Sequence, residues 1–181
     1  HNSELTSGGS SGGAGSGLGT QMLPVADGSD MMGSLRNPGA FNNVIGYRPS
    51  TNVMSGRDAS QRPLSTSGPM GRNTADTIQF LKTIAVKDVG ANFTPMNLSG
   101  MRIAWLGDLD NYLALELGIK PLCEASLSKV SDAGANVESV IPQFNFDDLW
   151  FCWTTLRHIG RASFKRFYDD PATRDMLKPD L

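Results

Sequence analysis

Glycine is concentrated in one stretch of this chain, and that stretch limits the possible fold more than any other feature. Eleven of the 20 glycines lie between Gly8 and Gly46. Ordering a glycine costs more backbone entropy than ordering any other residue, so this density indicates backbone that approaches something closely or adopts unusual angles. The stretch contains two serine sites, Ser10-Ser11 within GGSSGG and Ser34 within MGSLR. A loop, a short strand and a second loop would bring these serines to one edge.

The composition of the 181-residue chain is that of an ordinary globular protein. Hydrophobic residues make up 39% and charged residues 19%, which suits one domain with a sizeable core and argues against wholesale disorder. The net charge of −2 gives no reason to expect nucleic acid as a partner. No apolar run is long enough to span a membrane, and HNSELTS carries no signal peptide. Cys123 and Cys152 lie far apart, which indicates a reduced, cytoplasmic setting.

The motifs of the glycine-rich stretch follow one another in a familiar order. GGSSGG is followed by GSD, GSLRNP and GYRP, and this series resembles the signature of the amidase signature family. Members of that family cleave carbon–nitrogen bonds with two serines and a lysine. The resemblance places Ser10 on the bridging serine, whose peptide bond is cis, and Ser34, 24 positions later, on the nucleophile. It implies an α/β fold with a mixed β-sheet core flanked by helices, a small-molecule amide substrate and no cofactor.

The chemistry expected of Ser34 needs further groups. A serine hydroxyl is nearly inert at neutral pH, so it requires a base, and the transition state requires donors aimed at the developing oxyanion. The resemblance assigns the oxyanion hole to the backbone N–H groups of Met31, Met32 and Gly33. A glycine directly before the nucleophile also allows a tight turn.

Several neighbouring residues are expected to support the site. The resemblance implies that Ser11 forms hydrogen bonds around it, and Asp30 and Arg36 flank the nucleophile turn, where charge-assisted hydrogen bonds would hold the loops. Met32 stands where the family more often has glycine, which narrows the pocket and affects substrate scope. The pair Asn42-Asn43 replaces a commoner Cys-Gly, a change to which the sequence assigns no chemical consequence.

The third catalytic residue of the family is a lysine several dozen residues before the first serine, a place that precedes His1. No lysine precedes Lys82, and none downstream lies in a matching context. In the complete relay this lysine, buried and uncharged, would take the proton from the bridging serine. We therefore expect a central fragment of a longer family member that is inactive alone. A homodimer is possible, and two histidines with two separated cysteines make no metal set.

The remaining chain predicts alternating helices and strands. Residues 1–181 are interpreted as part of one domain, with a signature core at 1–49, a long loop at 50–72 and helix–strand units at 73–181. Strand, helix, strand and helix in the last part favour a βα-type unit. The expected elements are a glycine-diluted helix at 14–21, a buried strand at 23–26, a helical turn at 38–44, a strand at 44–47, a helix from Asn73 to Ala85, a strand at 101–106, a helix at 121–133, a strand at 137–141 and a helix at 147–159.

Other interpretations of the same motifs remain open. Within the family, the alternative is the glutaminase subunit of a tRNA-dependent amidotransferase, although the sequence Met-Gly-Ser favours a stand-alone amidase. Gly9 to Gly13 also fits the G-x-S-x-G elbow of α/β-hydrolases, with His158 as its histidine, but no strand precedes it. A phosphate-binding module lacks its specific motifs. A pseudoenzyme that keeps the fold without turnover is the remaining alternative.

Overall fold

A computed structural model describes residues 2, 4–50, 52–54, 64–90 and 95–177 of the chain. They divide into two compact units. The first unit comprises His1–Asn92 and Trp153–Leu181, and the second comprises Phe93–Cys152. The glycine-rich stretch lies entirely in the first unit.

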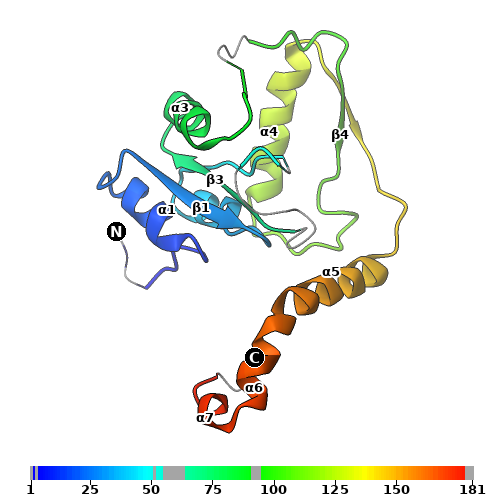
Figure 1. The fold of residues 1–181 in the computed structure, drawn as a ribbon. Coiled ribbons are helices and arrows are strands. Elements are labelled where there is room, and N and C mark those ends of the chain that lie inside the picture. Colours follow the sequence, from blue (N-terminus) through cyan, green and yellow to red (C-terminus); the bar gives the residue numbers. More distant parts are fainter. Residues whose placement is uncertain (1, 3, 51, 55–63, 91–94, 178–181) are drawn as a thin grey trace. The chain divides into compact units, whose positions relative to one another are not determined.

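The first unit is built on a three-stranded antiparallel sheet in the order β1-β3-β2. Its central strand β3 pairs with β1 from Val25↔Gly71 to Asp30↔Thr66, and with β2 at Ile45↔Gly71 and Gly46↔Met70. Helix α1 contacts both β1 and β3, and α3 contacts β3 (Figure 1). The elements are α1 (Gly12–Gly19), β1 (Val25–Asp30), α2 (Arg36–Phe41), β2 (Ile45–Gly46), β3 (Thr66–Gly71), α3 (Thr74–Ile84), a 3₁₀ turn (Ala162–Phe164), α6 (Lys165–Asp169) and α7 (Pro171–Arg174).

The core of this unit lies between the sheet and the helices around it. Leu18 of α1, Leu35 before α2 and Met70 of β3 are fully buried and form one cluster. Ala26 packs against the same cluster and is the cross-strand partner of Met70. The cluster therefore joins the helix that follows the first serine loop to the residue that follows Ser34.

Helix α3 begins where the sequence predicts. The Asn73 side chain accepts the N–H of Asp76 at 2.8 Å, which satisfies one of the unpaired donors of the first helical turn. Leu81 is buried on its inner face.

The second unit contains a parallel strand pair joined by a helix. Strand β4 (Arg102–Trp105) pairs with β5 (Asn136–Ser139), and α4 (Ile119–Asp132) connects them. Helix α4 is followed by Gly134, which has a φ of +101°, a conformation that glycine adopts without strain. This β–α–β unit is the one that the sequence predicts. Helix α5 (Phe146–Arg161) begins in this unit, with Asp147 and Asp148 in its first turn, and its residues from Trp153 onward belong to the first unit.

Two expectations for the first unit are wrong in detail. The strand expected at 23–26 begins at Val25 and continues through Asp27 and Gly28 to Asp30. The loop expected throughout 50–72 contains β3, the central strand of the sheet, while residues 51 and 55–63 of that loop lie outside the described residues. Both errors have one cause, because small and turn-forming residues are depleted in strands and favour the interpretation as loop.

The class expected from the sequence is confirmed. Helices surround strands that are antiparallel in one sheet and parallel in the other, so the chain is α/β with mixed strand pairing. Within the described part of the chain, no helix has the combined length and apolarity needed to cross a membrane.

Candidate active site

The two serine loops predicted from the sequence meet in the structure. The backbone N–H of Ser11 donates a hydrogen bond to the carbonyl oxygen of Ser34 at 3.3 Å. The peptide bond between Gly9 and Ser10 is cis, as the resemblance implies. Ser10 is exposed and Ser34 is half-buried, so solvent reaches the first of the two proposed catalytic serines and part of the second.

The Ser11 side chain fixes the first serine loop to strand β1. Its hydroxyl accepts the N–H of Ser29 at 3.3 Å and lies 3.4 Å from the Ser29 carbonyl oxygen, to which it donates. The hydrogen-bonding role that the resemblance implies for Ser11 at the site stays a prediction, and these bonds show where its side chain lies. Strand β1 ends one residue later at Asp30, where the nucleophile turn begins.

Gly28 lies at the point where both loops reach the sheet. A Cβ atom at Gly28 would lie 2.5 Å from the Ser11 hydroxyl and 2.8 Å from Cδ2 of Leu35. Its cross-strand partner Gly68 would place a Cβ 2.9 Å from the other methyl group of Leu35. The glycine pair therefore leaves room for the buried Leu35 side chain, which anchors the residue next to Ser34.

Asp30 holds the shape of the nucleophile turn. Its carboxylate is fully buried and accepts the backbone N–H of Gly33 at 2.9 Å and that of Leu35 at 3.3 Å. These two bonds close the turn on either side of Ser34. Arg36 adds a bidentate pair, with its two nitrogens 2.9 and 3.0 Å from the carboxylate oxygens. The predicted flanking roles of Asp30 and Arg36 thus correspond to one direct ion pair.

Arg48 is a second partner of Asp30 that the sequence-based prediction missed. Its Nη1 lies 2.9 Å from Oδ1 of Asp30 and also contacts the Asp30 carbonyl oxygen. Its Nη2 donates to the carbonyl oxygen of Leu64 at 3.0 Å. The GYRP motif contains this arginine and is the signal in the sequence that could have found it.

The Asp30 carboxylate is ionised at all physiological pH values. Burial opposes its charge and by itself raises the pKa, but the hydrogen bond from Arg36 and those from the N–H groups of Gly33 and Leu35 outweigh burial. The net effect lowers the pKa of Asp30 well below its ordinary range. The pKa of Arg36 is raised by the same bond. A permanent negative charge therefore organises the turn.

The backbone donors of the turn are not equivalent. The N–H of Gly33, one of the three predicted for the oxyanion hole, is already bound to Asp30 at 2.9 Å. Within the described residues, the N–H groups of Met31, Met32 and Ser34 have no acceptor. Gly33 has a φ of +100°, which aims successive peptide groups in different directions. The turn thus presents free N–H groups on both sides of Gly33.

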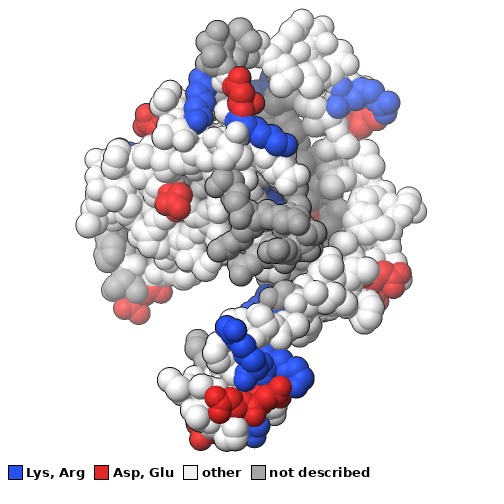
Figure 2. All heavy atoms as spheres, viewed as in Figure 1, with Lys and Arg blue, Asp and Glu red and all other residues white. Residues whose placement is uncertain are grey.

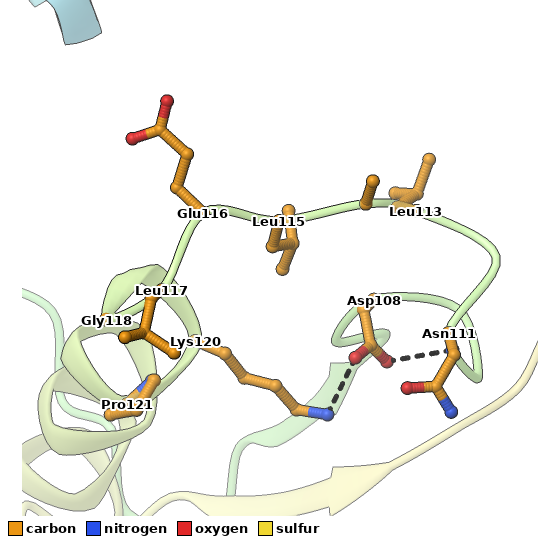
Figure 3. Close-up of a pocket in the computed structure, with 10 residues that line it drawn as sticks. Asp108, Asn111, Leu113, Leu115, Glu116, Leu117, Gly118, Lys120 and Pro121 are labelled. Carbon is orange, nitrogen blue, oxygen red and sulfur yellow. Dashed lines mark hydrogen bonds and ion pairs between the residues drawn. The ribbon is translucent and has the colours of Figure 1, made fainter.

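The second unit offers a lysine, but in an unsuitable state for the relay. Lys120 lines a pocket of about 400 Å³, together with the leucines of residues 113–117. Its Nζ donates to Oδ2 of Asp108 at 2.9 Å (Figure 3), and this bond raises the pKa of Lys120. A lysine that accepts a proton must be uncharged. The ion pair with Asp108 favours the ammonium form of Lys120.

Metal and α/β-hydrolase chemistry gain no support from the geometry. Among the described residues, no group of three His, Cys, Asp or Glu side chains is placed to hold a metal ion. The ring Nδ1 of His158 lies 2.7 Å from the Thr154 carbonyl oxygen of its own helix, the arrangement of a histidine on a helix surface.

A family model described as "Amidase" matches residues 1–165 of this chain. A glutamyl-tRNA(Gln) amidotransferase subunit of Acinetobacter baumannii is 30% identical over 148 residues, covering 74% of this chain and 30% of that protein. The corresponding protein of Sulfurisphaera tokodaii is 34% identical over 151 residues, covering 76% and 31%. The chain thus spans about a third of the length of the curated relatives it matches.

Solved structures agree with these sequence relatives. A bacterial aryl acylamidase of the amidase signature family superposes with a TM-score of 0.79, covering 99% of this chain and 41% of that one, at 22% identity. At 22% identity, this similarity supports the fold alone. The peptide amidase of Stenotrophomonas maltophilia is 30% identical, with a TM-score of 0.59 over 75% of this chain and 31% of its own. The motif order, the paired serine loops and these matches lead to one conclusion: the chain belongs to the amidase signature family.

Proposed function

We propose that the protein is an amidohydrolase that cleaves a non-peptide carbon–nitrogen bond of a small-molecule amide through a serine acyl-enzyme. The observation that carries the proposal is the hydrogen bond from the Ser11 N–H to the Ser34 carbonyl at 3.3 Å. It brings the loop of the proposed relay serine, Ser10, against the turn of the proposed nucleophile. Family membership supplies the reaction class.

In the proposed mechanism, Ser34 Oγ attacks the amide carbonyl carbon and its proton passes to Ser10. The carbonyl π electrons move to the oxygen, and the oxyanion receives N–H donors of the nucleophile turn. The free N–H groups of Met31, Met32 and Ser34 are the donors we assign, with the Gly33 N–H kept for Asp30. The carbon–nitrogen bond then breaks, and the leaving nitrogen takes a proton through Ser10. Water attacks the acyl-enzyme, which releases the acid and returns the proton to Ser34.

The relay requires a base behind Ser10. Serine is a poor proton acceptor at neutral pH, so we propose that a neutral lysine outside this sequence completes it, at the place the family resemblance gives upstream of His1. Without that residue we expect the 181-residue chain to show no turnover.

A fluorophosphonate probe tests the proposal on the intact natural protein. Intact-mass measurement should show one adduct, and peptide mapping should place it on Ser34. Ser34→Ala should take up no probe, while Ser16→Ala, a change in α1 outside the proposed site, should be labelled as the wild type. A folded wild-type protein that forms no adduct would contradict the proposal and favour a pseudoenzyme.

The second candidate is the glutaminase subunit of a tRNA-dependent amidotransferase. The observation in its favour is that the curated relatives at 30 and 34% identity are glutamyl-tRNA(Gln) amidotransferase subunits. Met32 in the turn, where the family more often has glycine, favours the stand-alone amidase. The second candidate would be favoured if ammonia release from glutamine increases when the partner protein of the amidotransferase is added. Hydrolysis of aryl or alkyl amides without any partner would favour the first candidate.

We further propose a cytoplasmic protein with a small-molecule substrate and without nucleic-acid or membrane partners. Cys123 and Cys152 are free thiols, which suits a reducing compartment. Figure 2 shows acidic and basic side chains interspersed on the viewed face, unlike the basic stripe of a nucleic-acid-binding surface. A homodimer is the oligomeric state to be tested, by sedimentation of the intact natural protein.

A further inference from the structure

Asn42, to which the sequence assigns no chemical role, connects the two halves of the proposed site. Its side-chain nitrogen Nδ2 donates to the carbonyl oxygen of Ser7 at 2.8 Å and to that of Pro38 at 2.9 Å. Ser7 precedes the cis peptide bond by two residues, and Pro38 lies in α2, directly after the nucleophile turn. Both protons of one amide group are therefore used to hold these segments together.

The backbone around Ser7 is pressed against α2 at the same place. A Cβ atom at Gly8 would lie 3.2 Å from the Pro38 backbone nitrogen and 3.2 Å from the ring of Phe41. Gly8 itself has a φ of +71°. The two residues that follow Ser7 are glycines, which have little intrinsic stiffness, so the contact with α2 and the Asn42 bonds define where this arm of the loop runs.

The other arm of the loop has its own anchor. Ser11 is bound to Ser29 through its hydroxyl and to the Ser34 carbonyl through its N–H. Ser10 thus lies between two residues that are held by hydrogen bonds, Ser11 one position later and Ser7 three positions earlier. Three residues span at most about 10 Å, so the bond at Ser7 restricts the space that Ser10 can explore.

We propose that Asn42 is a positioning residue, whose amide holds the Ser7 arm so that Ser10 stays within proton-transfer distance of Ser34. The inference rests on the proposed roles of these two serines. Proton transfer needs heavy atoms about 2.6–3.2 Å apart, and a misplacement of about 1 Å can cost about 100-fold in rate. Asn42 acts through the loop and does not touch substrate.

The test uses fluorophosphonate inactivation of the intact natural protein, which separates the maximal inactivation rate from the half-saturating probe concentration. Asn42→Ala should lower the maximal rate about 10-fold to 100-fold and leave the half-saturating concentration within about twofold. Asn73→Ala is the matched control, since it also removes an asparagine that bonds backbone in the first unit. It should lower the melting temperature similarly and leave the maximal rate unchanged.

Asn42→Asp keeps the size of the side chain, loses both donors at neutral pH, and serves if Asn42→Ala does not fold. It should show the same selective loss of the maximal rate. A maximal rate within twofold of wild type for the folded Asn42 variant, or the same loss in Asn73→Ala, would overturn the inference alone. A wild-type protein that takes up no probe on Ser34 would overturn the proposed function as well, so the two failures are distinguishable.

Discussion

Replacing Asp30 with asparagine removes the charge that organises the nucleophile turn. The carboxylate is fully buried and accepts bonds from two backbone N–H groups and two arginines. Breaking one side of a buried charged pair costs about 3–5 kcal/mol. The side chains of Arg36 and Arg48 are 57% and 32% exposed, so they regain hydration when the partner charge is lost. We therefore expect the lower end, a loss of about 3 kcal/mol in the free energy of unfolding.

Urea and thermal unfolding of the intact natural protein measure this loss. A loss of about 3 kcal/mol should also lower the melting temperature, and the fall per kcal/mol is smaller in a longer protein. Asp169→Asn is the control, because it makes the same chemical change in an exposed helical pair with Lys165, where the expected cost is below about 1 kcal/mol.

The same variant tests the link from stability to chemistry. Asp30→Asn should also slow fluorophosphonate labelling of Ser34, because the Gly33 and Leu35 bonds to the carboxylate set the turn around the nucleophile. An unfolding free energy no lower than that of Asp169→Asn would refute the view that Asp30 is the central charge of the turn. A normal labelling rate in a clearly destabilised variant would refute its proposed effect on Ser34.

Individual contacts support three further predictions. The pKa of Asp30 is lowered in the folded protein, so its ionised form stabilises the fold above the unfolded pKa of about 3.9. This contribution is lost as the pH falls toward the folded pKa. In urea titrations, the difference in unfolding free energy between wild type and Asp30→Asn should be constant from about pH 5 to 7 and should shrink below about pH 4. Asn73→Ala removes the α3 cap and should cost about 1 kcal/mol in urea unfolding, and no change would contradict the capping role. Gly28→Ala places a Cβ 2.5 Å from the Ser11 hydroxyl and should lower the free energy of unfolding by about 1–3 kcal/mol. The control Gly13→Ala, whose added Cβ has nothing within 4 Å, should be neutral or stabilising by up to about 1 kcal/mol. Equal effects of the two variants in thermal melts would contradict the argument that Gly28 allows a close approach.

The elements that the sequence predicts well are those whose local signals agree. Helix α3 has a capping asparagine, an acidic residue in its first turn and a buried Leu81 on its inner face. In the β4–α4–β5 unit, β4 contains Ile103, Ala104 and Trp105, and Gly134 after α4 has a positive φ. In these segments the local signals that are present favour the structure that the fold adopts, so tertiary contacts do not have to override local propensity.

The sequence nominates candidate residues of the site without showing their contacts. Motif order is enough to nominate Ser10, Ser34, Asp30 and Arg36, and the structure places the two serine loops together and joins the last two residues in an ion pair. The partnership of Arg48 with Asp30 is missed because it joins residues 18 positions apart across the sheet. Such pairing depends on strand register, which the sequence cannot supply once β3 is interpreted as loop.

The failure to predict β3 has a physical explanation that also concerns the site. Its sequence TSGPMG lacks β-branched and aromatic residues apart from one threonine, and it contains proline in a central strand, where proline is rarely found. Yet Gly68 faces Gly28 across the pair, and both leave the space that the Leu35 methyl groups fill. A larger residue at either position would raise β-propensity and displace the residue next to Ser34. The strand is therefore hard to recognise because its sequence suits the loops that lie against it. Small residues lower its β-propensity, and the same residues allow the Leu35 side chain to approach the sheet closely.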